Sequence, residues 1–325
     1  MKKVHVVAIL FLLFTAGIEA QQLPLYSQYM FNKFLINPAV AGSDGYTSIN
    51  LTAREQWIGI DNSPRTHSLS YQTRVLKRSY IIKSKSVKKK TYKPSTEGRV
   101  GIGGYFFDDR NGLVSRTGFQ FTYAYHIWLD ETQLSFGLSG TAFQFRINDE
   151  GLTFYDQSEP LLSGDLRKTL FVPDANFGVY LLNYRYHIGF SVAQLFQSYL
   201  KIGHAGLSDY RMLRHYYLSG GYVFPLQNGF TLEPSILIKT TEELLYQIDF
   251  SAKVQYKEDY WVGLSFRTAG AVILLAGVRL DKFYFGYAFD YTLSSIMKHS
   301  LGSHEFMMAV KFGDKARRYR WLDRY

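Results

Sequence analysis

Strict alternation between apolar and polar side chains recurs along most of this chain of 325 residues. In residues 246–256, for example, apolar residues such as Tyr246 and Phe250 alternate with polar residues such as Gln247 and Asp249. Because successive side chains of a β-strand point to opposite faces, this period of two predicts strands with one apolar and one polar face. The sequence therefore predicts an all-β fold.

By the same criterion we expect about fourteen antiparallel strands, of roughly the length that a tilted transmembrane strand requires. They are placed at 46–57, 66–75, 99–109, 117–129, 132–147, 174–183, 186–193, 214–225, 230–240, 246–256, 260–267, 271–280, 283–290 and 305–312. Bacterial outer-membrane barrels have an even number of strands, and aromatic residues, at 17% of the sequence, suit their apolar belt and girdles. We therefore expect a transmembrane outer-membrane β-barrel. A soluble β-sandwich is the alternative, since the sequence does not show which face points outward.

The connections between the expected strands alternate in length. Short ones at 130–131, 184–185, 226–229, 257–259 and 281–282 alternate with longer ones at 110–116, 148–173, 194–213, 241–245 and 291–304. Outer-membrane barrels have short periplasmic turns and longer outer loops. This parity places both ends of the barrel chain in the periplasm.

One long connection, residues 76–98, falls on the expected periplasmic side and is strongly basic, as is the tail 313–325. The candidate partner-binding residues in these two stretches are Lys88, Lys89, Lys90, Arg317, Arg318 and Arg320. A solvated basic loop is the simpler interpretation. The alternative is a docking site for an acidic periplasmic partner, which the basic, aromatic-flanked tail on the same side favours.

The N-terminus has the pattern of an exported protein. Residues 1–20 combine Lys2 and Lys3, a short apolar run and small residues before Gln21, which predicts a signal peptide. The sequence has no Cys, so no disulfides hold the exported chain together. The expected divisions are 1–20 signal peptide, 21–45 N-terminal periplasmic or plug-like segment, 46–312 β-barrel and 313–325 basic periplasmic tail.

The segment ahead of the first strand has no period of two. Instead, its apolar residues from Met30 to Leu35 recur at helical spacing, and Pro38 forces Asn37 out of the helical region and ends such a turn. We expect the segment either to enter the barrel as a plug or to cover its inner rim. The candidate plug or rim residues are Tyr29, Met30, Phe31, Phe34, Leu35, Asn37 and Pro38.

The formal net charge of +10 indicates the kind of partner. In an exported protein a basic balance points away from nucleic acid and toward acidic partners or anionic lipopolysaccharide and lipid head groups. Outer-membrane lipid is therefore an expected partner, and nucleic acid is not.

No pattern of residues identifies a reactive centre, so we expect no catalysis, no metal and no cofactor. The sequence has no phosphate-binding glycine loop, no nucleophile elbow and no His-Glu-x-x-His, and Cys is absent. The weaker candidates are the adjacent pair His304-Glu305, the scattered His126, His187 and His215, and an acidic loop of Asn148–Glu150 with Asp156. A rim pair, unconnected histidines and a solvated turn are the simpler interpretations.

Both ends of the mature chain resemble one protein family. Tyr26–Asn32, Asn37–Gly42 and Gln56–Asp61 are similar to the N-terminal signature of the PorP/SprF family, and Phe285–Ser295 with Gly302–Glu305 to its C-terminal region. The resemblance implies an outer-membrane barrel of the type IX secretion and gliding machinery. It implies secretion, or attachment at the cell surface, of proteins with a type B C-terminal sorting domain, and contact with periplasmic ring components. The loop 76–98 and the tail 313–325 are longer than a minimal member needs.

Three functions therefore remain. The first is a non-enzymatic barrel for secretion and surface attachment. The second is an outer-membrane transport barrel for a small hydrophobic or nutrient molecule, with the N-terminal segment as its plug. The third, a barrel hydrolase, would depend on one of the rim histidines.

Overall fold

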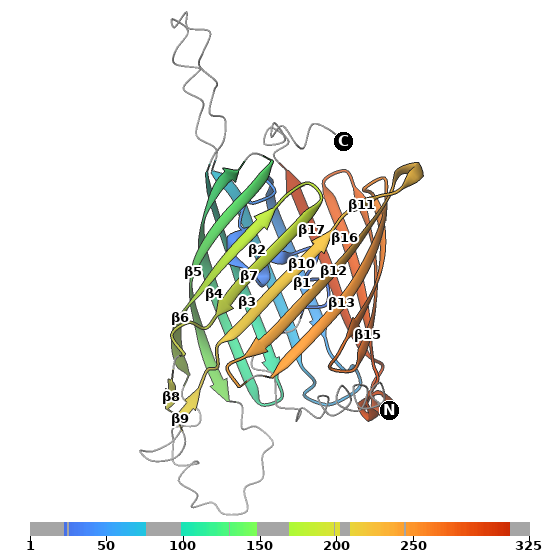
Figure 1. Ribbon diagram of the computed structural model, residues 1–325. Helices are drawn as coiled ribbons and strands as arrows, with labels where there is room; N and C mark the ends of the chain where they lie inside the picture. The colour runs from blue at the N-terminus through green and yellow to red at the C-terminus, as the bar shows by residue number, and fades with distance from the viewer. Residues whose placement is uncertain are drawn as a thin grey trace, which may run out of the picture.

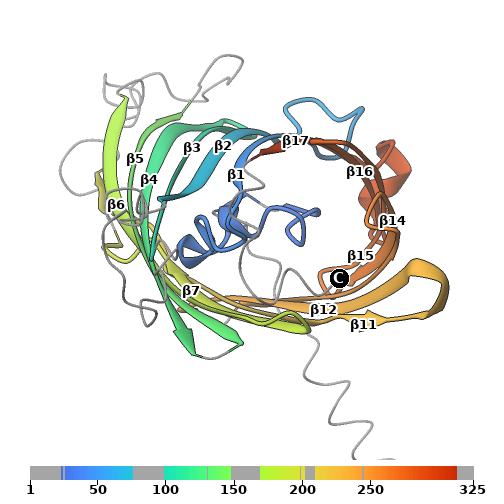
Figure 2. The same ribbon diagram turned by 90° about the horizontal axis from the view of Figure 1, so that it is seen from above.

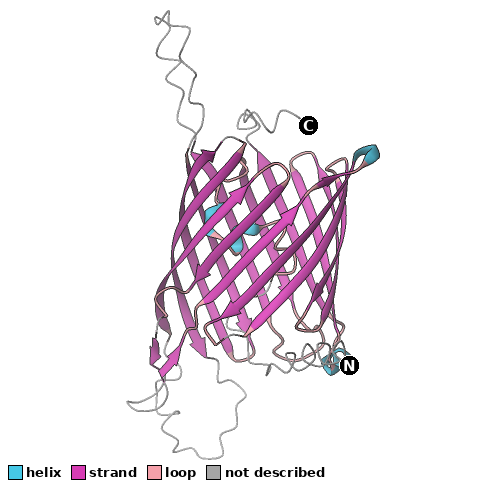
Figure 3. Cartoon of the chain, viewed as in Figure 1, coloured by secondary structure: helices cyan, strands magenta, loops and turns pink. Residues whose placement is uncertain are grey.

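The chain forms a closed, antiparallel β-barrel that surrounds the first residues of the described chain (Figure 1). The computed structural model describes residues 23–312 except 25, 76–98, 130, 148–168, 198, 202–208 and 244. Figure 3 shows that strands make up the wall and that the helical residues are confined to short turns. In the part of the chain that is described, no helix is long and apolar enough to cross a membrane.

The strands follow the alternation in the sequence closely. They are β1 (Thr47–Glu55), β2 (Arg65–Val75), β3 (Val100–Asn111), β4 (Val114–Leu129), β5 (Thr132–Ile147), β6 (Leu170–Leu182), β7 (Tyr186–Ala193), β8 (Tyr199–Lys201), β9 (Asp209–Arg211), β10 (His215–Tyr222), β11 (Phe224–Pro225), β12 (Phe230–Thr241), β13 (Tyr246–Tyr256), β14 (Tyr260–Arg267), β15 (Ala271–Leu280), β16 (Phe283–Thr292) and β17 (Ser303–Phe312). The short 3-10 turns are η1 (Lys33–Leu35), η2 (Pro38–Val40), η4 (Gln227–Gly229) and η5 (Ser295–His299).

Hydrogen bonding between neighbouring strands closes the wall. From β1 to β7 and from β12 to β17 each strand pairs with the next along the chain, β10 pairs with both β7 and β12, and β1 pairs with β17. Because the two-residue β11 follows β10 and pairs with the same β12, the wall has fourteen strands. The predicted fourteen-stranded antiparallel barrel is therefore confirmed.

The structure corrects two details of the predicted strands. The strand expected at 214–225 is interrupted at Val223, whose backbone N–H donates to the carbonyl of Arg185 instead of to the β10–β12 ladder. The connection expected at 194–213 contains the small two-stranded sheet of β8 and β9. Both features depend on contacts outside the local alternation.

The burial of the wall residues shows which face of the strands points outward, a point that the sequence did not determine. In β1, the polar Asn50 and Thr52 are buried against the interior, whereas Ile49 and Leu51 are 38% and 50% exposed on the outside. The same arrangement holds for Phe121, which is 62% exposed on β4. Large apolar side chains therefore form the outer surface, as expected for a wall that contacts lipid, and the soluble sandwich is excluded.

The two ends of the barrel differ in their connections. We call the end that carries the turns 183–185, 226–229, 257–259 and 281–282 the turn end. The opposite end, with the connections 56–64, 194–214 and 293–302, is the loop end and lies at the bottom of Figure 1. Among the described residues the predicted alternation of short and long connections holds only in part, because the loop-end connections 112–113 and 268–270 are short and the long connection expected at 110–116 is a two-residue turn.

Candidate functional site

The N-terminal segment occupies the interior of the barrel. We call Tyr26–Gly45 the lumenal segment; seen along the barrel axis, it lies within the ring of strands (Figure 2). It begins in the half nearer the loop end, where Ser27 contacts Glu305 near the start of β17. It reaches the turn end at Asp44, which accepts a 3.3 Å hydrogen bond from Lys311 near the end of β17. The chain then enters β1.

The segment is folded as short turns rather than as one helix. Its helical residues form the 3-10 turns η1 and η2, which replace the single helical turn predicted over Met30–Leu35. Asn37 is extended, at φ −140° and ψ 113°, as the following Pro38 predicts. Pro38 then occupies the first position of η2, where its missing N–H costs no hydrogen bond.

The apolar residues of the segment pack against the lumenal side of the wall. Tyr29 and Met30 are 2% and 5% exposed, in a cluster that includes Tyr217 of β10 and Ile273 of β15. Phe31 borders this cluster, 4.9 Å from the ring of Trp261. Apolar contact therefore holds the first half of the segment, even though most of the surrounding lumen is polar.

The second half of the segment packs in the same way on the opposite side. Phe34 is 1% exposed and packs with Val40 and Tyr180, and its ring lies edge-on to Tyr105 at 6.3 Å. Leu35 is half-buried and lines a cavity beside Phe34.

Glycines in the wall make room for the backbone of the segment. A Cβ at Gly101 of β3 would overlap the carbonyl of Ala41, and one at Gly137 of β5 would overlap the backbone of Ala39. Only a residue without a side chain permits such a close approach of two backbones. Gly101 therefore faces a crowded lumen, as does Gly103, where a Cβ would lie 2.8 Å from the ring of Phe34.

Asn37 joins the segment to two strands at once. Its side-chain carbonyl accepts the N–H of Ala39 at 2.9 Å, and its amide donates to the carbonyls of Val179 in β6 and Phe190 in β7, at 3.0 and 3.3 Å. The oxygen of this side chain lies where a Cβ at Gly178 would be. A single side chain thus caps η2 and fixes it to the wall.

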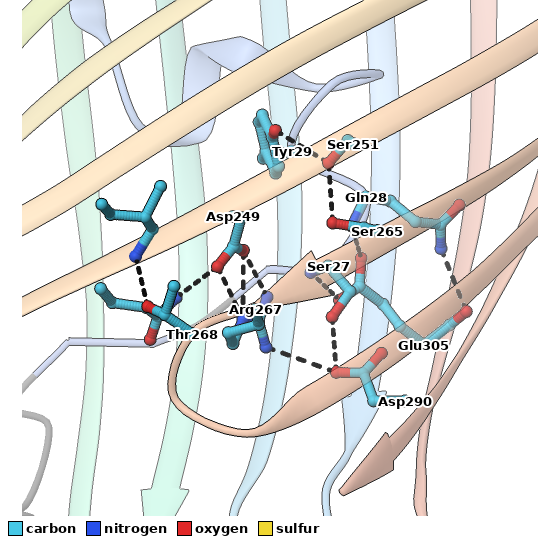
Figure 4. Close-up of polar contacts among 12 residues, drawn as sticks. Ser27, Gln28, Tyr29, Asp249, Ser251, Ser265, Arg267, Thr268, Asp290 and Glu305 are labelled. Atoms are coloured by element: carbon cyan, nitrogen blue, oxygen red, sulfur yellow. Dashed lines mark hydrogen bonds and ion pairs between the residues drawn. The ribbon is translucent and has the colours of Figure 1, made fainter. Parts of the chain in front are cut away.

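Ser27 contacts a group of buried charges at the place where the barrel closes (Figure 4). Arg54 of β1 donates to Ser27 Oγ at 2.7 Å, to Asp290 of β16 at 2.6 Å and to Glu305 of β17 at 3.2 Å. Ser27 in turn donates its N–H to Glu305 and its hydroxyl to Asp290, both at 2.7 Å. All four side chains are at least 98% buried.

The group continues along the wall and is balanced by backbone donors. Arg267 of β14 bonds to Asp249 of β13 at 2.9 Å and approaches Asp290 at 3.5 Å. We call Arg54, Asp249, Arg267, Asp290 and Glu305 the seam cluster. The seam cluster holds three carboxylates but only two guanidinium groups. The N–H groups of Ser27 and Gln28 both donate to Glu305, and their positive ends therefore stabilise the excess negative charge.

Lys33 places one charge of the segment itself inside the barrel. Its ammonium is 3.8 Å from Glu233 of β12, which also pairs with Lys253 of β13 at 2.6 Å. Burial lowers the pKa of Lys33 to about 8, and the negative charge of Glu233 opposes this shift. The segment is therefore held by an ion pair as well as by packing.

Further polar contacts tie the segment to other strands. Tyr29 shares a hydrogen bond of 3.2 Å with Ser251 of β13, and Ser191 of β7 donates to the Ile36 carbonyl at 2.6 Å. His126 of β4 contacts the Ala41 carbonyl at 3.1 Å. The segment thus connects strands from all around the barrel.

The lumenal segment lies between two cavities. One of about 70 Å³, toward the loop end, is lined by Tyr26, Phe34 and Leu35 together with Tyr105 and Asp174. The other, of about 230 Å³, lies toward the turn end and is lined by Met30 and Phe31 together with wall residues such as Lys311. The segment therefore divides the interior that these cavities occupy.

The structure separates the residues of the weaker catalytic candidates. Glu305 points into the lumen, whereas His304 points outward and bonds to the hydroxyl of Tyr287 at 2.7 Å. Adjacent residues of a strand face opposite sides, so the pair His304-Glu305 forms neither a dyad nor a rim pair.

The three scattered histidines each have their own partners. His126 bonds to Ser135 at 2.7 Å, His187 lies 3.7 Å from Glu233, and His215 bonds to the carbonyl of Leu213 at 3.0 Å. Among the described residues, no group of three His, Asp or Glu side chains is placed to hold a metal ion.

Some candidates lie outside the described residues. These are Lys88, Lys89, Lys90, Arg317, Arg318, Arg320 and the acidic loop of Asn148–Glu150 with Asp156. The seam cluster, by contrast, was not predicted. Its signal in the sequence is charged residues on the polar faces of expected strands, such as Arg54 and Asp249.

Comparison with known proteins gives one match to a family and several to folds. The family model described as "Type IX secretion system membrane protein PorP/SprF" matches residues 18–310. No curated protein matches the sequence.

Three of the solved structures that are similar to this chain are a toluene transporter, a porin and BamA. The toluene transporter TbuX of Ralstonia pickettii is 9% identical, with a TM-score of 0.46 over 86% of this chain and 92% of that one. The KdgM porin is 9% identical, with a TM-score of 0.37 over 82% and 98%. BamA of Haemophilus ducreyi lacking POTRA domains 1–3 is 7% identical, with a TM-score of 0.39 over 82% and 70%.

Proposed function

Because the chain belongs to the PorP/SprF family of type IX secretion system membrane proteins, we propose that it is a non-enzymatic barrel of the secretion and gliding machinery. In this role it helps to secrete proteins with a type B C-terminal sorting domain or anchors them at the cell surface. The protein lies in the outer membrane, as its family and its barrel fold indicate.

The lumenal segment is the observation that carries this proposal. It runs through the barrel from near the loop end to the turn end and bonds to strands on several sides. A barrel occupied in this way supports a role in docking and attachment more than diffusion through a wide pore. The candidate plug residues from Tyr29 to Pro38 then act as the element that keeps the barrel closed.

Orientation follows from the lengths of the connections. We place the loop end at the cell surface and the turn end in the periplasm, because outer-membrane barrels have short periplasmic turns. The cargo then meets the loop end. The periplasmic ring components meet the turn end, and the docking residues are Lys88, Lys89, Lys90, Arg317, Arg318 and Arg320.

The test is the surface proteome of a strain that lacks this protein. We expect proteins with the type B sorting domain to be lost from the cell surface and recovered in the medium or the periplasm. Re-expression of the wild-type chain should restore them, while unrelated outer-membrane proteins stay unchanged. An unaltered surface proteome in the deletion strain would overturn the proposal.

The second candidate is a transport barrel for a small hydrophobic or nutrient molecule. The cavity of about 70 Å³ near the loop end favours it, because its lining includes aromatic residues such as Tyr26, Phe34 and Phe107. Uptake or conductance by the purified wild-type barrel, together with normal secretion in the deletion strain, would select this function over the first.

A further inference from the structure

A row of arginines lies on the outer wall at the loop end. Arg65 of β2 pairs with Arg110 of β3, Arg110 with Ser115 of β4, and Ser115 with Arg146 of β5. We call these four residues the arginine row. All four point away from the lumen, because their strand neighbours Thr66, Asp109, Arg116 and Phe145 are the buried ones. Since neighbouring strands are about 4.8 Å apart, the row spans roughly 15 Å of the wall.

The charges of the row are incompletely balanced. Arg110 pairs with Asp108 at 3.3 Å. Arg65 has Glu55 of β1 as its cross-strand neighbour, but the Glu55 carboxylate pairs with His67 at 3.5 Å, so neither Arg65 nor Arg146 forms an ion pair among the described residues. Like charges directly opposite each other in a sheet are destabilising. The direct pairing of Arg65 with Arg110 therefore indicates a surface that an external anion would stabilise.

An apolar row runs parallel to the arginine row on the same face. It consists of Leu69, Phe106, Phe119 and Ala142, which pair in the same order and lie four residues further along each strand. Leu69, Phe106 and Phe119 are 49%, 51% and 57% exposed. Four residues of a strand cover about 13 Å. The wall thus carries cationic side chains near its rim. Its aromatic side chains lie deeper in the membrane, by about the length of one lipid head group.

Strands β13–β16 of the wall do not carry this combination. On β13–β16, the outermost residues that point outward are Tyr246, Phe266, Val272 and Tyr291, none of them charged. At the arginine row there is also a polar cavity of about 500 Å³. Arg65, Arg110 and Arg146 line it, together with the three carboxylates of Glu55, Asp61 and Asp108.

We propose that this face binds a phosphorylated glycolipid of the outer leaflet through its phosphate groups. Guanidinium groups stay charged and bind phosphate in a bidentate manner, and the acyl chains lie against Leu69, Phe106 and Phe119. The proposal rests on the orientation given above, with the loop end at the surface. It does not depend on which cargo the barrel handles, so it and the secretion role can fail separately.

The test is lipid binding by the purified barrel in detergent, followed by native mass spectrometry. The probe is diphosphoryl lipid A, and the variant is R65Q/R110Q/R146Q. We expect its affinity to fall roughly tenfold or more, because each charge-assisted contact is worth more than a neutral one. The matched control K257Q/K282Q/K298Q removes three exposed lysines elsewhere and should bind like the wild type.

Three arms identify the ligand. Dephosphorylated lipid A should bind as weakly to the wild type as diphosphoryl lipid A does to the variant, and inorganic phosphate should not compete at the same concentration. Equal binding by the arginine variant and the lysine control would overturn the proposal, as would a preference for phosphatidylglycerol. If the triple variant does not fold, the double variant R65Q/R146Q, which leaves the Arg110–Asp108 pair intact, decides the question by the same comparison.

Discussion

At the scale of single residues, Arg54 and Glu305 face each other across the seam where β1 meets β17. Both are buried, and each bonds to Ser27 of the lumenal segment. A buried ion is stable only if it is paired and its remaining hydrogen-bonding groups are satisfied. The seam cluster pairs each of its ions, with side chains from β1, β13, β14, β16 and β17 and with backbone N–H groups of the segment, and leaves Arg54 Nε and Asp290 Oδ1 without a hydrogen-bond partner.

We predict that Arg54→Gln destabilises the barrel by about 3 kcal/mol, because it leaves Glu305 buried without a cation and Asp290 with only its 3.5 Å contact to Arg267. The measurement is the free energy of unfolding in urea, in detergent. The control is Arg279→Gln, which breaks a pair of 3.5 Å with the exposed Glu258 and should cost under about 1 kcal/mol. Equal losses in the two variants would show that burial of the seam cluster contributes nothing.

The glycines of the wall give a second prediction at this scale. Gly137→Val should displace the lumenal segment, because a side chain there overlaps the backbone of Ala39. The native sequence has no Cys, so Ala39→Cys can report on the segment by itself. Ala39 is fully buried, so the cysteine should resist maleimide in the single variant and react when Gly137→Val is added.

The control for this experiment lies on the same strand. A side chain at Gly140 meets nothing within 4 Å, so Gly140→Val should leave the introduced cysteine protected. If the cysteine of Ala39→Cys reacts equally with Gly137→Val and with Gly140→Val, the wall does not hold the segment at Gly137.

The charges of the seam cluster are visible in the sequence, but their pairing is not. Arg54, Asp249 and Asp290 are recognisable as polar-face residues of predicted strands. That Arg54 meets Asp290, 236 positions away, depends on the register between strands from opposite ends of the chain. No local pattern carries that information.

At the scale of elements, the strands were predictable and the lumenal segment was only partly so. Alternation is a local property, and it located all fourteen wall strands within a few residues. The helical spacing of Met30–Leu35 indicated a turn, but its 3-10 form and its neighbour η2 depend on contacts such as those of Asn37 with β6 and β7. Those contacts are set by the tertiary structure.

We predict that deletion of residues 27–41 opens the barrel. The deletion removes the side chains that separate the cavities of about 70 and 230 Å³, while all the wall strands remain. Single-channel recording in planar bilayers should show larger and more frequent conductance than the wild type. Both proteins should still migrate differently with and without boiling, which confirms a folded barrel. Equal conductance would contradict a closing role for the segment.

At the scale of the whole molecule, the outer wall, the interior and the two ends of the barrel each contact something different. Lipid meets the apolar outer wall, the lumenal segment occupies the polar interior, and the two ends remain for partners. The sequence alone did not show which face was outside, because alternation is symmetric. The exposed aromatics and buried polar residues of the closed wall settle that point.

We predict that charge reversal at Lys88, Lys89 and Lys90 to Glu weakens co-purification with an acidic periplasmic partner. The reason is the loss of attraction between the basic loop and that partner. The detergent-extracted barrel and its variant are compared by quantitative mass spectrometry of bound proteins. Reversal of the exposed Lys298 at the loop end is the control and should change nothing. An unaltered set of bound proteins would leave the loop as a solvated connection.

The contact between Ser27 and Glu305 joins residues 278 positions apart, near the two ends of the described chain. The lumenal segment therefore completes its interactions only when the last strand is in place. The pairing of β1 with β17 also closes the barrel, so the segment is enclosed when these two strands pair. The Ser27–Glu305 contact and the sealing of the wall thus depend on the same strand, and an intermediate that lacks β17 has neither.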